Sequence, residues 1–252
     1  MTVELSVLGD MRAHIGGRPV DLGHARRQCV LVALLADANG VVPVERLADR
    51  VWGERPPERA RETLYSYLSR LRSAFAPARE RLRIERRPGG YLLALDPSAG
   101  IVDLHRFRSL VEQAREQPGD ERAVVPLERA LALWRGEPFA SLESPWLNDL
   151  RGALLQERLA AELDRNDLRL RHDRHPGLLG ELTVGAERNP LNERLAGQLM
   201  LALCHEGRSA EALRHYEHFR RELASELGAD PGAELQRLHL RILDGDPTLG
   251  RP

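Results

Sequence analysis

The chain has 252 residues, of which 42% are hydrophobic and 30% are charged, and its formal net charge is −1. This length allows one large domain or two modest ones, each with its own core. No apolar run approaches the ~18 to 20 residues of a membrane span, and the first ten residues lack the pattern of a signal peptide. We therefore expect a globular cytoplasmic protein that uses no membrane.

All 37 basic residues are arginine. The absence of lysine excludes a Walker A phosphate loop and a Schiff base. The charge is also unevenly distributed: residues 1–96 hold 16 arginines and 12 acidic residues, whereas residues 97–252 hold 21 arginines and 26 acidic residues. A basic first part joined to an acidic second part fits a DNA-binding module followed by a protein-contacting module.

The first half of the chain predicts a small sheet followed by helices. Short alternating runs in the first twenty residues, separated by glycine turns, indicate an antiparallel sheet. The segment "HARRQCVLVALLADANG" is typical of an amphipathic helix that ends at Gly40. A second helix is expected in "VVPVERLADRVWG", with Pro43 near its first turn and Gly53 at its end.

The segment "ARETLYSYLSRLRSAF", residues 60–75, predicts a third helix with two distinct faces. At 3.6 residues per turn, four apolar side chains share one stripe and a second stripe carries hydroxyls and arginine. The apolar stripe is Leu64, Leu68, Leu71 and Phe75, and the polar stripe is Thr63, Ser66, Arg70 and Ser73. Such a polar face fits either solvent or a groove of DNA.

Next, "RLRIERRPGGYLLAL" predicts a hairpin around Pro-Gly-Gly. A small sheet, three helices and a hairpin describe a winged helix-turn-helix, whose recognition helix enters the major groove. We then expect Ser66 and Arg70 to face base edges, where an arginine can bond a guanine bidentately. Thr63 and Arg72 would hold phosphates, which position the module without reading sequence.

Two further arginines, Arg86 and Arg87, precede the turn of the predicted wing. An arginine there can enter a narrow minor groove or grip a phosphate. The alternative is an exposed, solvated pair. The wing is therefore a candidate second contact with DNA.

The segment "DPSAGIVD", residues 96–103, breaks the pattern and marks the predicted boundary between residues 1–96 and residues 97–252. From Leu104 onward nearly every segment reads as helix, and "LNERLAGQLMLALCHEGRSAEALRHYEHF" resembles one tetratricopeptide unit. Near the end, Gly228 is expected just after a helix and Asp230 as the N-cap of the next. The predicted fold class is mainly α with a small β component: a winged helix-turn-helix followed by an all-α, tetratricopeptide-like domain of helical hairpins.

The sequence gives little support for a catalytic site or a metal site. His215 and His218 lie one turn apart, and His172 pairs with His175, but neither pair has the close partners of a recognisable zinc motif. No Gly-x-Ser-x-Gly elbow or Gly-rich phosphate loop occurs. We expect no catalytic residue, no cofactor and no metal site, and we interpret the two cysteines as buried reduced thiols.

Specific motifs resemble a known family. Residues 1 to about 96 resemble the OmpR/PhoB type of winged helix in "LADRVWG", "TLYSYLSRLRSAF" and "GGYLL". Residues 103–246 resemble the bacterial transcriptional activation domain in "ALALWRGEPF", "ERLAAELDRNDLRL", "QLMLALCHEGRSAEALRHYEHFRREL" and "ELGADPGAEL". Together they resemble the SARP class, the Streptomyces antibiotic regulatory proteins.

This resemblance implies a transcriptional activator of secondary-metabolite genes, with a cytoplasmic, nucleoid-associated location. The implied partners are double-stranded promoter DNA carrying direct repeats, RNA polymerase holoenzyme, and a second copy of the chain on DNA. By position, the resemblance assigns base-facing, phosphate-facing and wing roles. The implied base-facing residues are Ser66 and Arg70. The implied phosphate-facing residues are Thr63, Ser69 and Arg72, and the implied wing arginine is Arg87.

Two alternatives stay open. In the first, the chain is a helical-repeat adaptor whose N-terminal domain binds protein instead of DNA, as the near-neutral total charge would allow. In the second, the activator is gated by a small molecule lodged between the helical hairpins. Neither a receiver domain nor an ATPase pattern occurs within these residues, so we expect activity to depend on protein amount, a ligand or partners.

Overall fold

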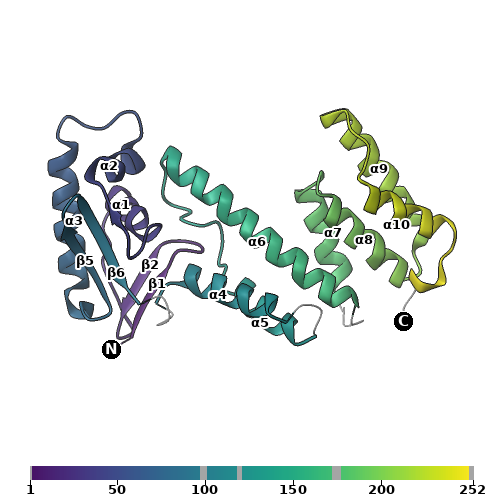
Figure 1. Ribbon diagram of the computed structural model, residues 1–252, viewed down its shortest axis with the longest axis horizontal. Coiled ribbons are helices and arrows are strands. Elements are labelled where there is room, and N and C mark those ends of the chain that lie inside the picture. The colour runs from purple at the N-terminus through teal and green to yellow at the C-terminus, as the bar shows by residue number, and fades with distance from the viewer. Residues whose placement is uncertain (1, 97–100, 118–120, 172–176, 250–252) are drawn as a thin grey trace. The chain divides into compact units, whose positions relative to one another are not determined.

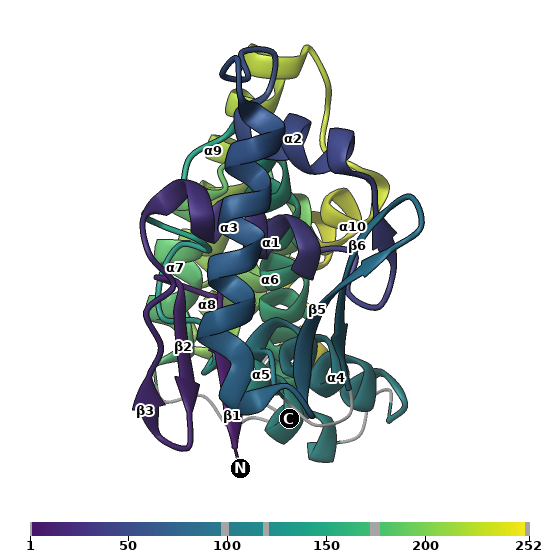
Figure 2. The ribbon, with the colours of Figure 1, turned by 90° about the vertical axis from the view of Figure 1, so that its left-hand side faces the viewer.

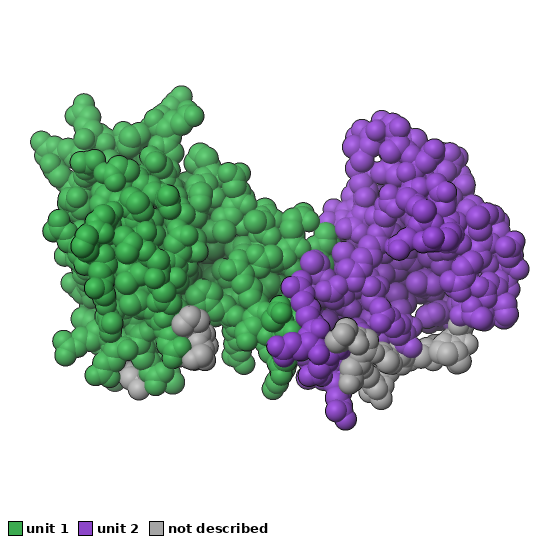
Figure 3. Space-filling view, viewed as in Figure 1, with its two compact units in different colours: residues 1–113, 128–159 green, residues 114–127, 160–252 purple. Residues whose placement is uncertain are grey.

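The computed structural model describes residues 2–96, 101–117, 121–171 and 177–249 (Figure 1). The chain divides into two compact units, coloured in Figure 3: unit 1 is Met1–Gln113 with Glu128–Leu159, and unit 2 is Ala114–Leu127 with Ala160–Pro252. Helices predominate in both, and the strands of the described part form two small sheets. The predicted fold class, mainly α with a small β component, is confirmed.

Unit 1 begins with a three-stranded antiparallel sheet in the order β1-β2-β3. Its strands are β1 (Val3–Ser6), β2 (Arg12–Ile15) and β3 (Arg18–Pro19). Val3 pairs with Ile15 and Leu5 with Ala13, and all four side chains are buried. Alternate residues of a strand face the same side, so one face of this sheet lies against the core. The small N-terminal sheet predicted from the sequence is therefore present.

Three helices follow: α1 (Ala25–Leu35), α2 (Val44–Trp52) and α3 (Ala60–Phe75). The helix α1 ends at Leu35, earlier than the predicted stop at Gly40. Asn39 has a left-handed φ of 66°, and its amide N–H donates to the Leu93 carbonyl at 2.9 Å. Its side-chain oxygen also accepts the N–H of Leu95 at 3.0 Å. The residues after Leu35 thus bond to the hairpin instead of continuing the helix.

The second sheet contains the hairpin, in the order β4-β6-β5. Its strands are β4 (Val41–Val42), β5 (Leu82–Arg87) and β6 (Gly90–Leu95). Gly89 turns the chain with a φ of 88°, a conformation that favours glycine. A side chain at Gly90 would collide with the carbonyl oxygen of Val42. The close pairing of β4 with β6 therefore requires glycine there, and the predicted wing is confirmed as a hairpin.

The apolar stripe of α3 lies in the core of unit 1. Leu64, Leu68 and Leu71 are completely inaccessible to solvent, and Phe75 is 2% exposed. This stripe packs against α1, α2 and β5. Figure 2 shows α3 in front of α1, with β5 and β6 along one side. Because the apolar stripe is buried, the opposite stripe must face outward.

Residues beyond position 96 complete the N-terminal sheet of unit 1. The Leu5 N–H donates to the Ile101 carbonyl at 2.7 Å, and the Arg135 N–H donates to the Leu8 carbonyl at 2.8 Å. The Phe139 N–H also donates to the Gly9 carbonyl at 2.9 Å. The main chain around residues 5–9 is thus bonded to segments that the sequence assigned to the second domain.

A buried carboxylate holds the same junction. Asp103 begins α4 (Asp103–Arg115), and its carboxylate accepts the N–H groups of Val7 at 2.9 Å and Leu8 at 3.2 Å. The Arg135 guanidinium pairs with this carboxylate at 2.6 Å. Only 8% of the Asp103 side chain is exposed, so solvent screens these interactions weakly.

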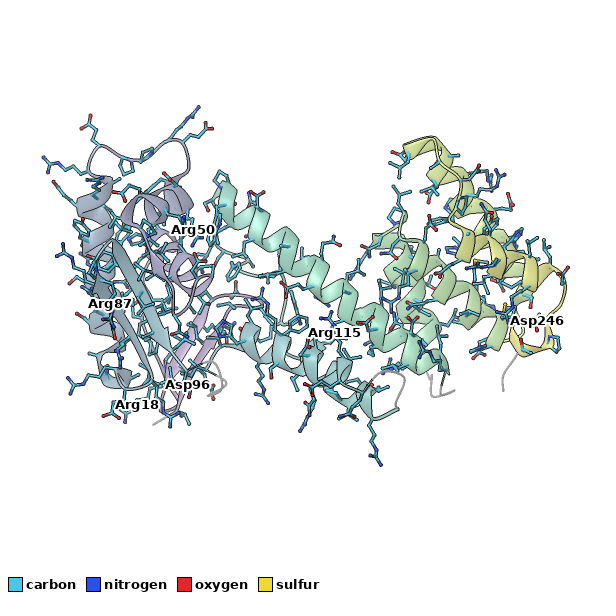
Figure 4. All side chains as sticks on the ribbon, in the orientation of Figure 1. Arg18, Arg50, Arg87, Asp96, Arg115 and Asp246 are labelled. Atoms are coloured by element: carbon cyan, nitrogen blue, oxygen red, sulfur yellow. The ribbon has the colours of Figure 1, made fainter. Side chains whose placement is uncertain are left out.

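A second junction joins α2 to the start of α6 (Pro145–Arg171). The Ser144 hydroxyl donates to the Arg50 carbonyl at 2.8 Å and accepts the Leu147 N–H at 3.1 Å, which caps α6. The Arg50 guanidinium lies 4.6 Å from the centroid of the Trp146 ring, and Arg50 is labelled in Figure 4. Unit 1 therefore contains the winged helix together with α4 and the first part of α6. The division at residues 96 and 97 stays a prediction, and residues 97–100 lie outside the described part.

Unit 2 is built from helical hairpins. It contains the first half of α5 (Val124–Leu131), up to Leu127, and the second part of α6. Its other helices are α7 (Leu178–Arg188), α8 (Glu193–His205), α9 (Ser209–Leu227) and α10 (Ala233–Leu243). The chain also forms short 3-10 helices at Ala76–Ala78, Glu121–Ala123 and Pro247–Leu249. Neighbouring helices α7 and α8, and α8 and α9, pack against each other (Figure 1).

The ends of the last two helices test two predictions from the sequence. Gly228 caps α9 with a left-handed φ of 65°, as expected. The prediction of Asp230 as the N-cap of α10 was wrong, because Gly232 occupies that position. The Gly232 N–H donates to the Glu193 carboxylate of α8 at 2.8 Å. The start of α10 is thus bonded to a carboxylate of α8, distant in sequence, and not to Asp230.

Cys29 and Cys204 are both buried and unbridged, as predicted. Burial raises the pKa of each thiol. Within the described ranges, no helix combines the length and apolar character needed to cross a bilayer.

The Asp103 junction gives a first testable prediction. Replacing Asp103→Ala leaves the N–H groups of Val7, Leu8 and Leu104 without their acceptor and the Arg135 guanidinium without its partner. The free energy of unfolding should therefore fall by about 2–4 kcal/mol. Urea denaturation followed by circular dichroism measures this change. Asp10→Ala, at an exposed residue of the nearby loop, is the control and should change stability by less than about 0.5 kcal/mol. Equal stabilities of the two variants would contradict the role of Asp103.

Candidate nucleic-acid interface

The outer face of α3 carries short polar side chains beside an arginine. Ser66, Ser69 and Arg70 are exposed, and Thr63 is half-buried. Because serine side chains are short, the helix backbone can closely approach a surface that binds to this face. Arginine supplies a planar donor fork that matches guanine edges and phosphates. The structure thus brings four of the predicted residues to one accessible face of α3.

Aromatic contacts hold one flank of α3. The Tyr67 ring stacks on Trp52 of α2 with 6.4 Å between centroids, and it meets His24 edge-on at 5.0 Å. Together with the buried apolar stripe, these contacts limit rotation of α3 about its own axis. The outward direction of Ser66 and Arg70 therefore follows from packing.

Arg72 occupies a different environment from the other predicted residues. Its guanidinium Nε donates to the Ile84 carbonyl of β5 at 2.9 Å. The same group lies 5.2 Å from the centroid of the Tyr91 ring of β6. Arg72 thus fastens α3 to the wing, a role that the sequence did not indicate. Its contact with phosphate stays a prediction.

The wing carries three arginines and one carboxylate on β5. Glu85 pairs with both Arg83 and Arg87, which lie two residues away on the same face of the strand. The hydrogen bond from Arg83 is the main reason that the pKa of Glu85 lies below its usual value. Arg86 is exposed and pairs in register with Tyr91, and Figure 4 labels Arg87 on the hairpin.

The wing keeps a net positive charge, because β5 carries three arginines and one carboxylate and only Arg83 and Arg87 pair with Glu85. Alternate residues of a strand share a face, so the spacing of Arg83, Glu85 and Arg87 in "RIERR" could have predicted this pairing. Sequence reasoning also missed Tyr65, whose exposed ring lies on α3 beside the wing. The surface formed by α3 and the wing is therefore polar and basic, with one accessible aromatic side chain.

Of the two histidine pairs, His215 and His218 fall within the described part of the chain. His172 and His175 lie outside the described residues. Burial lowers the pKa of His215, and His218 lies 3.5 Å from the Glu222 carboxylate. No group of three or more His, Cys, Asp or Glu side chains suited to a metal ion occurs among the described residues.

Comparisons with known proteins cover both halves of the chain. The family model described as "Bacterial transcriptional activator domain" matches residues 102–243, and "Transcriptional regulatory protein, C terminal" matches residues 17–93. Regulatory protein DnrI of Streptomyces peucetius is 34% identical, over 99% of this chain and 95% of its own length. Regulatory protein AfsR of Streptomyces griseus is 37% identical over 99% of this chain, which spans only 25% of AfsR.

A solved structure shows the same architecture. EmbR of Mycobacterium tuberculosis, in complex with a low-affinity phosphopeptide, superposes with a TM-score of 0.90 at 29% sequence identity. The similarity covers 97% of this chain and 66% of the EmbR chain. The two family models lie on either side of the predicted domain boundary.

The winged helix and the helical hairpins that follow it define a transcriptional regulator. The chain belongs to the SARP family, as its two family models and its similarity to DnrI and AfsR show.

The internal contacts of Arg72 give a second prediction. Arg72→Ala removes a hydrogen bond and a cation–π contact between α3 and the wing, so the free energy of unfolding should fall by about 1–2 kcal/mol. Thermal or urea unfolding measures the change. Arg70→Ala, on the exposed face of the same helix, is the matched control and should shift stability by no more than about 0.5 kcal/mol. If both substitutions lower the free energy of unfolding by the same amount, Arg72 does not hold α3 to the wing.

Proposed function

We propose that the chain binds double-stranded promoter DNA through α3 and the wing, and that it activates transcription of secondary-metabolite genes. The observation that carries the proposal is the buried apolar stripe of α3, which leaves Ser66, Ser69 and Arg70 exposed on the opposite side. A basic hairpin beside that face supplies the second element of a winged-helix contact.

Each predicted residue has a role in this proposal. Ser66 and Arg70 read base edges in the major groove. Thr63, Ser69 and Arg72 hold phosphates. On the wing, Arg86 and Arg87 meet the minor groove or its phosphates.

The finer features of the proposal concern partners and location. The promoter would carry direct repeats, so that two copies of the chain lie head-to-tail on DNA rather than about a two-fold axis. Residues 1–96 would bind DNA, and residues 97–252 would recruit RNA polymerase holoenzyme. The protein would act in the cytoplasm, at the nucleoid. Similarity to the regulators DnrI and AfsR supports this reading.

The proposal makes a direct prediction for the recognition helix. Arg70→Ala should weaken binding to a preferred duplex by about ten- to a hundredfold while leaving the fold intact, because a bidentate base contact contributes roughly 1–3 kcal/mol of discrimination. Footprinting and fluorescence anisotropy with a duplex that the wild-type protein selects from a random library measure this loss. Arg214→Ala removes the same charge from an exposed position of α9 and should leave binding unchanged.

Unchanged binding by the Arg70→Ala variant would contradict the placement of α3 in the major groove. A mobility-shift assay over graded salt separates the activator from a helical-repeat adaptor. DNA binding gives a retarded band whose affinity falls with salt, by a slope of about 0.9 per phosphate contact. An adaptor gives no retarded band at any salt concentration.

A further inference from the structure

Tyr65 is an exposed aromatic residue on a helix whose other outward side chains are polar. The residue is 44% exposed. The ring lies 6.2 Å from the ring of Tyr91, at an interplanar angle of 50°. Tyr91 is buried in β6 and pairs in register with Arg86 of β5. Tyr65 therefore lies where α3 meets the wing, with one side of its ring held by the protein.

The position of Tyr65 on α3 differs from that of the base-facing residues. Successive residues of a helix are separated by about 100°, and residues four apart lie on the same side. Tyr65 and Ser69 thus share the flank that faces the wing, whereas Ser66 points about 100° farther round. Arg72, two turns after Tyr65 on the same flank, contacts the wing at Ile84 and Tyr91.

If α3 and the wing bind the same duplex, one DNA strand must cross the flank of α3 that faces the wing. A helix in the major groove and a wing in the adjacent minor groove lie on opposite sides of one sugar–phosphate backbone. The residues between the helix and the wing face that backbone. Tyr65 and Ser69 occupy this position, and a tyrosine hydroxyl reaches several ångströms farther than a serine hydroxyl.

We propose that the Tyr65 hydroxyl donates a hydrogen bond to a phosphate of the strand that separates the two grooves. This inference rests on the proposed function and adds a neutral contact to the arginine contacts. Tyrosine hydroxyls are regular donors to phosphate oxygens. Since Tyr91 already holds the ring, little side-chain entropy is lost when the hydroxyl binds. Tyr65 fixes the position of α3 relative to the backbone and carries no sequence information.

The test is the substitution Tyr65→Phe, which keeps the ring and its contact with Tyr91 but removes the donor. Binding to the selected duplex and to a mixed-sequence duplex should weaken by the same factor, about tenfold. The slope of log K against log salt should stay unchanged, because no charge is lost. Arg86→Ala, by contrast, should flatten that slope. Tyr216→Phe removes a hydroxyl from α9 in unit 2 and is the matched control, with binding expected to equal that of the wild type.

Duplexes with single methylphosphonate substitutions locate the phosphate. At one position the methylphosphonate should weaken binding by the wild-type protein but should have little further effect on binding by the Tyr65→Phe variant. If the wild type binds DNA while Tyr65→Phe binds equally well, the inference is overturned and the proposed function stands. If the losses of binding free energy from the methylphosphonate and from Tyr65→Phe are additive at every position, the phosphate contact is likewise overturned. If the wild type binds no duplex, the proposed function fails and this inference fails with it.

Discussion

Burial of the apolar stripe of α3 determines which side chains of this helix are accessible to DNA. Leu64, Leu68 and Leu71 have no contact with solvent, and rotating the helix to expose them would cost several kcal/mol of hydrophobic free energy. This packing fixes which side of α3 faces outward. Ser66 and Arg70 are presented together because the residues on the other side cannot leave the core.

The same helix also depends on structure outside the first 96 residues. Asp103 bonds the loop after β1, and Ser144 bonds the end of α2 while capping α6. Both side chains are buried, so these contacts couple the winged helix to α4 and to the start of α6. The segment that folds together in unit 1 is therefore larger than the segment that would contact DNA. A truncation at residue 96 would expose the edge that Asp103 covers.

Much of the fold follows from local patterns in the sequence. The period of the apolar residues predicted α3 and the helices of unit 2, and the Pro-Gly-Gly turn predicted the wing. Local patterns failed where a residue distant in sequence decides the structure. Glu193 of α8 bonds the N-cap residue Gly232 of α10, and Asp103 joins segments about a hundred residues apart. The candidate face of α3 was predictable from its helical period. The internal role of Arg72 was not, because it depends on how the hairpin packs.

Disulfide trapping can show whether Ser66 lies in the major groove of bound DNA. The native thiols, Cys29 and Cys204, are buried and leave little background reactivity. The variant Ser66→Cys is mixed with duplexes that carry a thiol tethered to a base in the major groove. If α3 lies in the major groove, Ser66→Cys forms a crosslink at one or two base positions, whereas Thr183→Cys on α7 forms none. Ser66→Cys that still binds the duplex but forms no crosslink at any major-groove position would contradict the account.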